Sequence, residues 1–263
     1  MLTTLAAPAF AGTWYIEDGD ITVKAGETEG TNKVSQGANQ EVEDTDTIIK
    51  NREDTASSNT VTIDAGNDKV EVTLDNVNIK TDSGSALTSN GDVTLTLKGE
   101  NHLTGGNGDI YGGDGITSRG SLTISGGTVT ATGGGSTGSN GLGGRGICSD
   151  SGGVTISGGT VKAAGGNGSG ISSSSGVTVS DGTVTANGGN GGNVSGDGIR
   201  SDGGVTISGG TVKAAGGDSK DGYGGDGIRS GGGVTISGNT VNAAGGNGGK
   251  VGGYGICSFD RVA

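Results

Sequence analysis

The chain has 263 residues, of which 63 are glycine, one is proline and only 3% are aromatic. Collagen is excluded because it needs glycine at every third position and abundant proline. The net charge of −12 lies in residues 1–110, which hold 19 acidic and 7 basic residues, whereas residues 111–263 hold nine of each. An acidic chain without a basic stripe argues against nucleic acid as a partner, and no apolar run is long enough for membrane insertion.

The first residues predict the remnant of a secretory signal. Ala9-Phe10-Ala11 has the small-x-small form of a cleavage site. We therefore expect residues 1–11 to be this remnant and the protein to be secreted, extracellular or at a cell surface. An ordinary N-terminal tail is the alternative.

Residues 12–59 lack the repeat that fills the rest of the chain, and they carry Trp14, Tyr15, Ile48 and Ile49. We predict that they form an N-terminal cap, since the open end of a solenoid is an unpaired sheet edge. Weaker repeats follow, with apolar alternation around Val61, Val72 and Val93.

A repeat dominates residues 60–263. A Gly-Ile dipeptide is followed six or seven residues later by a Val-Thr-Ile-like tripeptide, and an alanine lies nine residues after the start of that tripeptide. Only the segment from this alanine to the next Gly-Ile varies in length. We expect constant segments to be strands and variable ones to be surface loops. The isoleucines are Ile116, Ile147, Ile171, Ile199, Ile228 and Ile256.

The constant segments predict three short strands per repeat, because each alternates apolar and polar residues. Glycines between the second and third strands would supply positive φ at a tight corner. Such short strands are stable only when stacked on their own copies. The sequence therefore predicts a parallel β-helix of about seven rungs. We expect it to be right-handed, since left-handed forms usually have a shorter, uniform hexapeptide period.

Two cysteines, Cys148 and Cys257, occupy the same place in repeats that lie four rungs apart. At roughly 4.8 Å per rung their separation is about 19 Å, whereas a disulfide needs Cα atoms within about 7 Å. We expect two outward-facing free thiols.

A charged cluster is predicted where Gly-Asp-Gly-Ile recurs on adjacent rungs. Asp197 and Asp226 each precede an arginine, Arg200 and Arg229, by three residues. One interpretation is a mutually paired surface ladder. The other is a carbohydrate site, in which the arginines bind a sugar carboxylate and the aspartates bind hydroxyl groups or Ca²⁺. The candidate metal ligands are Asp197, Asp226, Asp202 and Asp221.

Tyrosines in the glycine-rich loops are candidates for stacking on sugar rings, with local loop packing as the alternative. They are Tyr111, Tyr223 and Tyr254. Lys162 and Lys213 point outward from the third strand, with Thr185 between them, and would add positive charge.

Catalysis is not expected from this sequence. Its one histidine, His102, has no assignable nucleophile and carboxylate, and the glycine-rich loops match no P-loop. A polysaccharide lyase would need a base beside a calcium cluster, and Lys213 near Asp197, Asp202 and Asp226 is the one set available.

Residues 12–23, GTWYIEDGDITV, followed by Val-Thr-Ile-Ser-Gly-Gly-Thr-Val repeats with Gly-Ile, resemble the extracellular bacterial carbohydrate-binding β-helix family. The likeness covers roughly residues 12–258. It implies a shape related to pectate-type polysaccharide lyases, together with binding of polygalacturonate and calcium. We expect a non-catalytic protein that binds an acidic polysaccharide. The alternatives are a surface adhesin that self-associates through its C-terminal edge, where the sequence stops partway round a rung, and a lyase.

Overall fold

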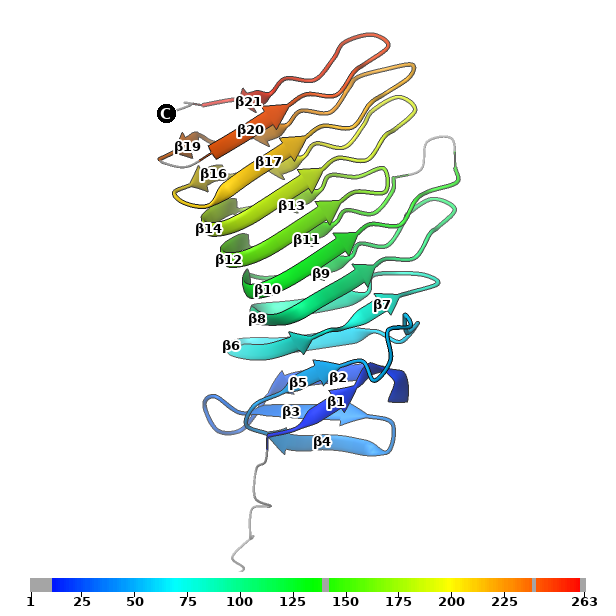
Figure 1. Cartoon of the computed structure of the whole chain (residues 1–263), viewed down its shortest axis with the longest axis vertical. Helices are drawn as coiled ribbons and strands as arrows, with labels where there is room; N and C mark the ends of the chain where they lie inside the picture. Colours follow the sequence, from blue (N-terminus) through cyan, green and yellow to red (C-terminus); the bar gives the residue numbers. More distant parts are fainter. Residues whose placement is uncertain (1–10, 139–141, 238–239, 261–263) are drawn as a thin grey trace, which may run out of the picture.

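The computed structural model describes residues 11–138, 142–237 and 240–260. The first ten residues of the predicted signal remnant lie outside this part. The described chain is an all-β parallel solenoid of about seven turns, which confirms the predicted fold class. Figure 1 shows the coils stacked along the long axis, with the N-terminal strands at one end. The single helical element among these residues is a 3₁₀ turn, η1 (Ile16–Asp18).

Each coil of the repeat has three faces. The first face holds the short Gly-Ile strands, and the second and third faces share one bent strand or two separate ones. The first-face strands are β9 (Ile116–Ser118), β11 (Ile147–Ser149), β13 (Ile171–Ser173), β15 (Ile199–Ser201), β18 (Ile228–Ser230) and β21 (Ile256–Ser258). The others are β10 (Leu122–Thr132), β12 (Gly153–Ala164), β14 (Gly176–Asn187), β16 (Gly204–Ile207), β17 (Thr211–Ala215), β19 (Val234–Ile236) and β20 (Thr240–Ala244).

Like residues stack directly over one another, as the constant spacing predicted. Ile171 pairs with Ile147 on one side and Ile199 on the other, all in parallel register. The tripeptide valines and the third-strand alanines pair in the same way. The six Gly-Ile isoleucines thus form one column, buried except at the last coil. Aliphatic columns of this kind fill the narrow interior without aromatic side chains.

The glycine corners have the predicted backbone conformation. Gly126, Gly159, Gly182 and Gly210, between the second and third strands, have φ from 71° to 93°. A side chain is disfavoured in this left-handed region, so the glycines allow the tight turn.

Serines of the Gly-Ile-x-Ser segment point into the interior and fasten the next corner. The Ser149 hydroxyl donates to the Gly120 carbonyl at 2.8 Å and accepts from the Gly152 N–H at 3.1 Å. Ser118, Ser149, Ser173, Ser201 and Ser230 are all buried. This bonding satisfies a polar column inside an apolar core.

The weaker upstream repeats also join the solenoid. They form β6 (Val61–Asp75), β7 (Asn78–Lys80) and β8 (Leu87–Thr104). Val61 pairs with Leu87, and Leu87 pairs with Ile116 of the first strong repeat. These residues therefore extend the isoleucine column toward the N-terminus.

Residues 12–59 cover the N-terminal end with strands of both directions. They are β1 (Thr13–Tyr15), β2 (Ile21–Ala25), β3 (Asn32–Gln36), β4 (Asn39–Asp44) and β5 (Ile48–Lys50). The strands β1, β2 and β5 lie parallel to the coils, whereas β2, β3 and β4 form an antiparallel meander. Buried Trp14 donates its Nε1–H to Asp44 Oδ2 at 2.7 Å, which ties the first strand to this meander.

Candidate functional site

The loops that join the third face to the next first face form an ordered edge along the solenoid. Ser219 bridges to Gly191 and Gly248, and Tyr223 bridges to Val194 and Val251, all in parallel. The segments predicted as surface loops thus continue the stacking at the surface.

Polar side chains fasten these loops to one another. Asn190 Oδ1 accepts the Asp218 N–H at 2.8 Å, and Asp218 Oδ1 accepts the Asn247 N–H at 2.6 Å. Each of these side chains satisfies a backbone donor in the next coil. The loops differ in length, but the hydrogen bonds of Asn190 and Asp218 hold the backbones of neighbouring loops together.

The aspartates of Gly-Asp-Gly-Ile form a second column of the same kind. Asp197 Oδ1 accepts the Asp226 N–H at 2.7 Å, and Asp226 Oδ1 accepts the Tyr254 N–H at 2.7 Å. Both carboxylates are buried. One oxygen of each aspartate is therefore committed to the fold.

The second oxygen of each aspartate faces the arginine three residues later. Arg229 Nη1 lies 3.3 Å from Asp226 Oδ2, and Arg200 Nη1 lies 4.0 Å from Asp197 Oδ2. Arg200 and Arg229 pair in register on adjacent coils and are partly exposed. Each guanidinium has five N–H donors, and the Arg200 and Arg229 side chains are 50% and 39% exposed.

The buried Asp197 carboxyl is electrostatically perturbed. Burial raises the pKa of Asp197, and the neighbouring Asp226 charge acts in the same direction. The Asp226 N–H and the two arginines oppose this rise. The balance still disfavours the ionised form.

This raised pKa predicts a pH-dependent stability. Between the usual aspartate pKa of 3.8 and the raised value, the folded state binds more protons than the unfolded state. The stability contribution of Asp197 therefore falls as the pH rises through this window. D197N keeps an oxygen for the Asp226 N–H but cannot ionise. The unfolding free energy of D197N minus that of the wild type should increase from about pH 4 toward pH 7, measured by denaturant titration. A difference that is constant with pH would contradict this.

A groove of about 330 Å³ lies over the last three coils, beside these arginines. It brings together four of the predicted carbohydrate-binding residues, Arg200, Arg229, Tyr223 and Tyr254, with Asp197 and Asp226 at its base. Gly224, Gly225, Gly252 and Gly253 also line it. A Cβ at Gly224, Gly225 or Gly253 would collide with the backbone of a neighbouring coil, so these glycines allow the close stacking beneath the groove.

The other predicted site residues lie elsewhere. Lys162 and Lys213 are exposed on the third face, two coils apart with Thr185 between them in register, and they do not line the groove. Tyr111 lies in an earlier coil, where it bridges to Leu142. Asp202 lies 3.9 Å from Arg200 Nε, and neither it nor Asp221 lines the groove.

Sequence reasoning missed several residues of this edge. Val194 and Val251 line the groove and are 68% and 51% exposed. Lys250 places its ammonium 5.9 Å from the centre of the Tyr223 ring. The available signal was positional, since an apolar residue stands five places before the Gly-Ile isoleucine in each long loop. Val194 and Val251 were not predicted as surface residues because aliphatic residues in a repeat usually belong to the core.

The aspartates predicted as calcium ligands are spread over the groove and its surroundings, and calcium binding stays a prediction. Asp197 and Asp226 are engaged by backbone N–H groups and arginines, as described above. Within the described ranges no group of three or more His, Cys, Asp or Glu side chains could hold a metal ion.

In an earlier coil, the aspartate of this column is Asp114, and it pairs with Arg145 of the next coil. The Arg145 N–H donates to Asp114 Oδ1 at 2.6 Å, and its guanidinium pairs with Asp114 at 3.2 Å and Asp150 at 3.3 Å.

Cys148 is free but fully buried, rather than exposed as an outward-facing position suggested. Burial raises the pKa of this thiol, so it is a poor nucleophile. Cys257, on the last coil, is free and partly exposed.

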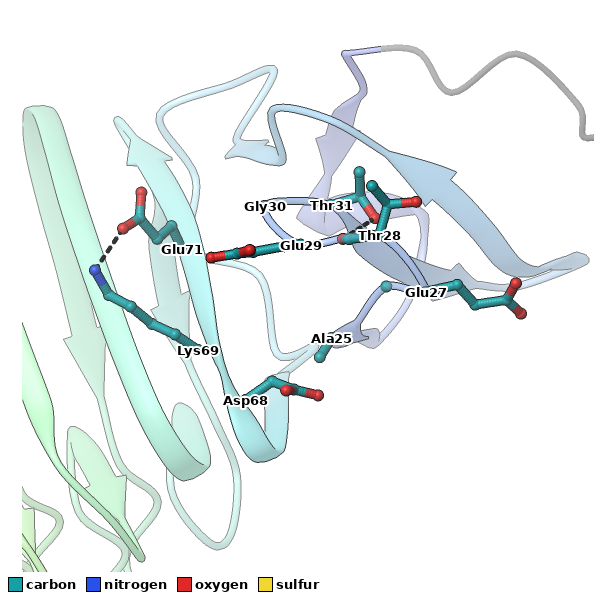
Figure 2. Close-up of a pocket in the computed structure, with 10 residues that line it drawn as sticks. Ala25, Glu27, Thr28, Glu29, Gly30, Thr31, Asp68, Lys69 and Glu71 are labelled. Atoms are coloured by element: carbon teal, nitrogen blue, oxygen red, sulfur yellow. Dashed lines mark hydrogen bonds and ion pairs between the residues drawn. The ribbon is translucent and has the colours of Figure 1, made fainter.

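A larger groove, of about 560 Å³, lies at the N-terminal end between the β2–β3 turn and β6. Figure 2 shows Glu29 pointing from the turn toward the strand that carries Glu71, whereas Glu27 points away. Lys69 pairs with Glu71 at 2.6 Å. The net charge of this lining is negative, and no predicted site residue belongs to it. It is unsuited to an anionic ligand.

Three segments of the chain, residues 122–144, 154–175 and 205–228, match the model of a β-helix repeat. The fold and these segments together define a protein built from β-helix repeats. Searches of curated proteins and of solved structures gave no significant match. Among the described residues, no helix is long and apolar enough to span a bilayer.

Proposed function

We propose that this protein is a non-catalytic extracellular protein that binds an acidic, pectin-like polysaccharide in the groove over its last three coils. The observation that carries the proposal is the pair Arg200 and Arg229, stacked on adjacent coils. Arg229 lies 3.3 Å from buried Asp226 and Arg200 lies 4.0 Å from buried Asp197, and Tyr223 and Tyr254 line the same groove. The pair of arginines offers N–H donors to a carboxylate.

The aromatic groups give the groove its second property. Tyr223 and Tyr254 are 53% and 64% exposed, although the rest of the repeat region is almost free of aromatics. Exposed tyrosines present a rigid apolar face with a polar tip, which suits the C–H face and the hydroxyl groups of a sugar ring. Carboxylate recognition and ring stacking together favour a uronic acid polymer.

The geometry favours binding over catalysis. Lys213, the one candidate base for a lyase, lies outside the groove that contains Asp197 and Asp226. Both aspartates accept a backbone N–H from the next coil, and both face an arginine. We therefore propose no catalytic residue and no step that requires calcium.

Two double variants test this proposal. R200A/R229A removes two positive charges from the groove, whereas K162A/K213A removes the same charge from the third face. Retention on immobilised polygalacturonate should weaken about tenfold or more for the first variant, because charge-assisted bonds are lost, and little for the second. Wild-type retention should fall with added salt and persist with a chelator.

Three outcomes would overturn the proposal. Equal loss in both variants would show that general positive charge, not the groove, retains the polymer. New ultraviolet absorbance from unsaturated products would favour the lyase. Absence of retention, together with concentration-dependent assembly in sedimentation, would favour the self-associating adhesin.

A further inference from the structure

A column of exposed apolar side chains runs along the loop edge. Its members stand five residues before the Gly-Ile isoleucine in the long loops. They are Tyr111, Leu142, Val194, Tyr223 and Val251, and each is between 51% and 71% exposed. Backbone bridges join Tyr111 to Leu142, and join Val194 through Tyr223 to Val251. The column therefore follows the solenoid axis.

One short loop divides this column into two patches. The segment 165–170 that precedes β13 has no counterpart of the exposed residue. The first patch is Tyr111 and Leu142, and the second patch is Val194, Tyr223 and Val251. At roughly 4.8 Å per coil the two patches are about 10 Å apart, and the whole column is about 24 Å long.

The two patches differ in charge. The second patch adjoins Arg200 and Arg229 in the groove. Arg145, three residues after Leu142, is paired with Asp114 and Asp150. Among the described residues, the first patch thus offers apolar contact beside a paired arginine, and the second lies beside the two groove arginines.

We propose that an acidic polysaccharide lies parallel to the solenoid axis and contacts both patches, so that the first patch is a second sugar subsite. This inference rests on the proposed function. Exposed apolar patches mark interaction surfaces, and the second patch lines the arginine groove while the first lies further along the same axis. An extended polysaccharide advances one pyranose ring over about the rise of one coil. A chain anchored at Arg229 by its carboxylates therefore reaches Tyr111 only when it is several sugars longer than the groove.

The test compares two galacturonate oligomers, a trimer and an octamer, by isothermal titration. Y111A removes the ring of the first patch, and Y111F keeps the ring without its hydroxyl. Octamer affinity should fall about fivefold in Y111A and stay near the wild-type value in Y111F, as expected for one lost ring contact. Trimer affinity should be the same in all three proteins, since the trimer fits within the groove. Tyr111 is 71% exposed, so neither change should alter the melting temperature.

The outcomes separate the two proposals. If the wild type binds neither oligomer, the proposed function fails and the subsite fails with it. If both oligomers bind in an R200A/R229A-sensitive way but Y111A leaves octamer affinity unchanged, the function stands and the axial subsite is wrong. The variant comparison is decisive because an octamer offers several overlapping registers to a single groove, which alone raises its apparent affinity.

Discussion

G225A should destabilise the loop edge by about 3 kcal/mol or more and abolish binding in the groove. A Cβ at Gly225 would collide with the backbone carbonyl of Gly196 in the coil before it. That carbonyl belongs to a stacked backbone and cannot rotate away as a flexible side chain could. We expect the coil to separate from its neighbour locally, which would displace Asp226 and Arg229. Thermal unfolding and polygalacturonate retention measure both effects.

Gly192 provides the matched control in the same loop system. A Cβ there would meet no atom within 4 Å, and its φ is not in the left-handed region. G192A should therefore leave the melting temperature and the retention close to those of the wild type. Similar losses in G192A and G225A would mean that glycine flexibility, not close stacking, is what the loops require.

I199A should cost about 2–5 kcal/mol of stability. Ile199 is fully buried in the isoleucine column, so truncation leaves a cavity between Ile171 and Ile228. It is also the residue directly before Arg200, so the loss should weaken the groove as well. Denaturant unfolding with polymer retention would measure the two consequences.

The control for this change is an isoleucine outside the core. Ile110 is 63% exposed, and I110A should change stability by only a few tenths of a kcal/mol. If I110A and I199A were equally destabilising, the interior column would not be the main source of stability.

The register of the coils could be predicted from the sequence because burial of the short strands and the tight corners both require particular residues at particular places. Ile171 must be buried for a strand of three residues to persist, and Ile147 and Ile199 lie against it because the strand segments recur in each coil although the loops differ in length. The positive φ of Gly182 could be predicted for the same reason, since a tight corner needs it. The three β-helix repeat segments match within this part of the chain.

The remaining features depended on contacts that one sequence does not reveal. Ile21 pairs in parallel with Val61, but the meander of residues 32–44 interrupts the spacing between them. The aspartates of the predicted cluster are correctly placed side by side, yet their bonds to the next coil's N–H groups emerge only in three dimensions. Lys213 and Arg200 belong to the same repeat, but Arg200 lies on the first face and Lys213 on the third face.

The Asp column has a direction that bears on how the molecule is made. Ser85, Asp114, Ser169, Asp197 and Asp226 each accept a hydrogen bond from an N–H in a later coil. During synthesis, a completed coil with one of these residues therefore presents an acceptor to the segment that emerges next from the ribosome, whereas the coil of Arg145 has a donor at this position. The coils can therefore form in the order of translation, each new coil pairing with the coil completed before it.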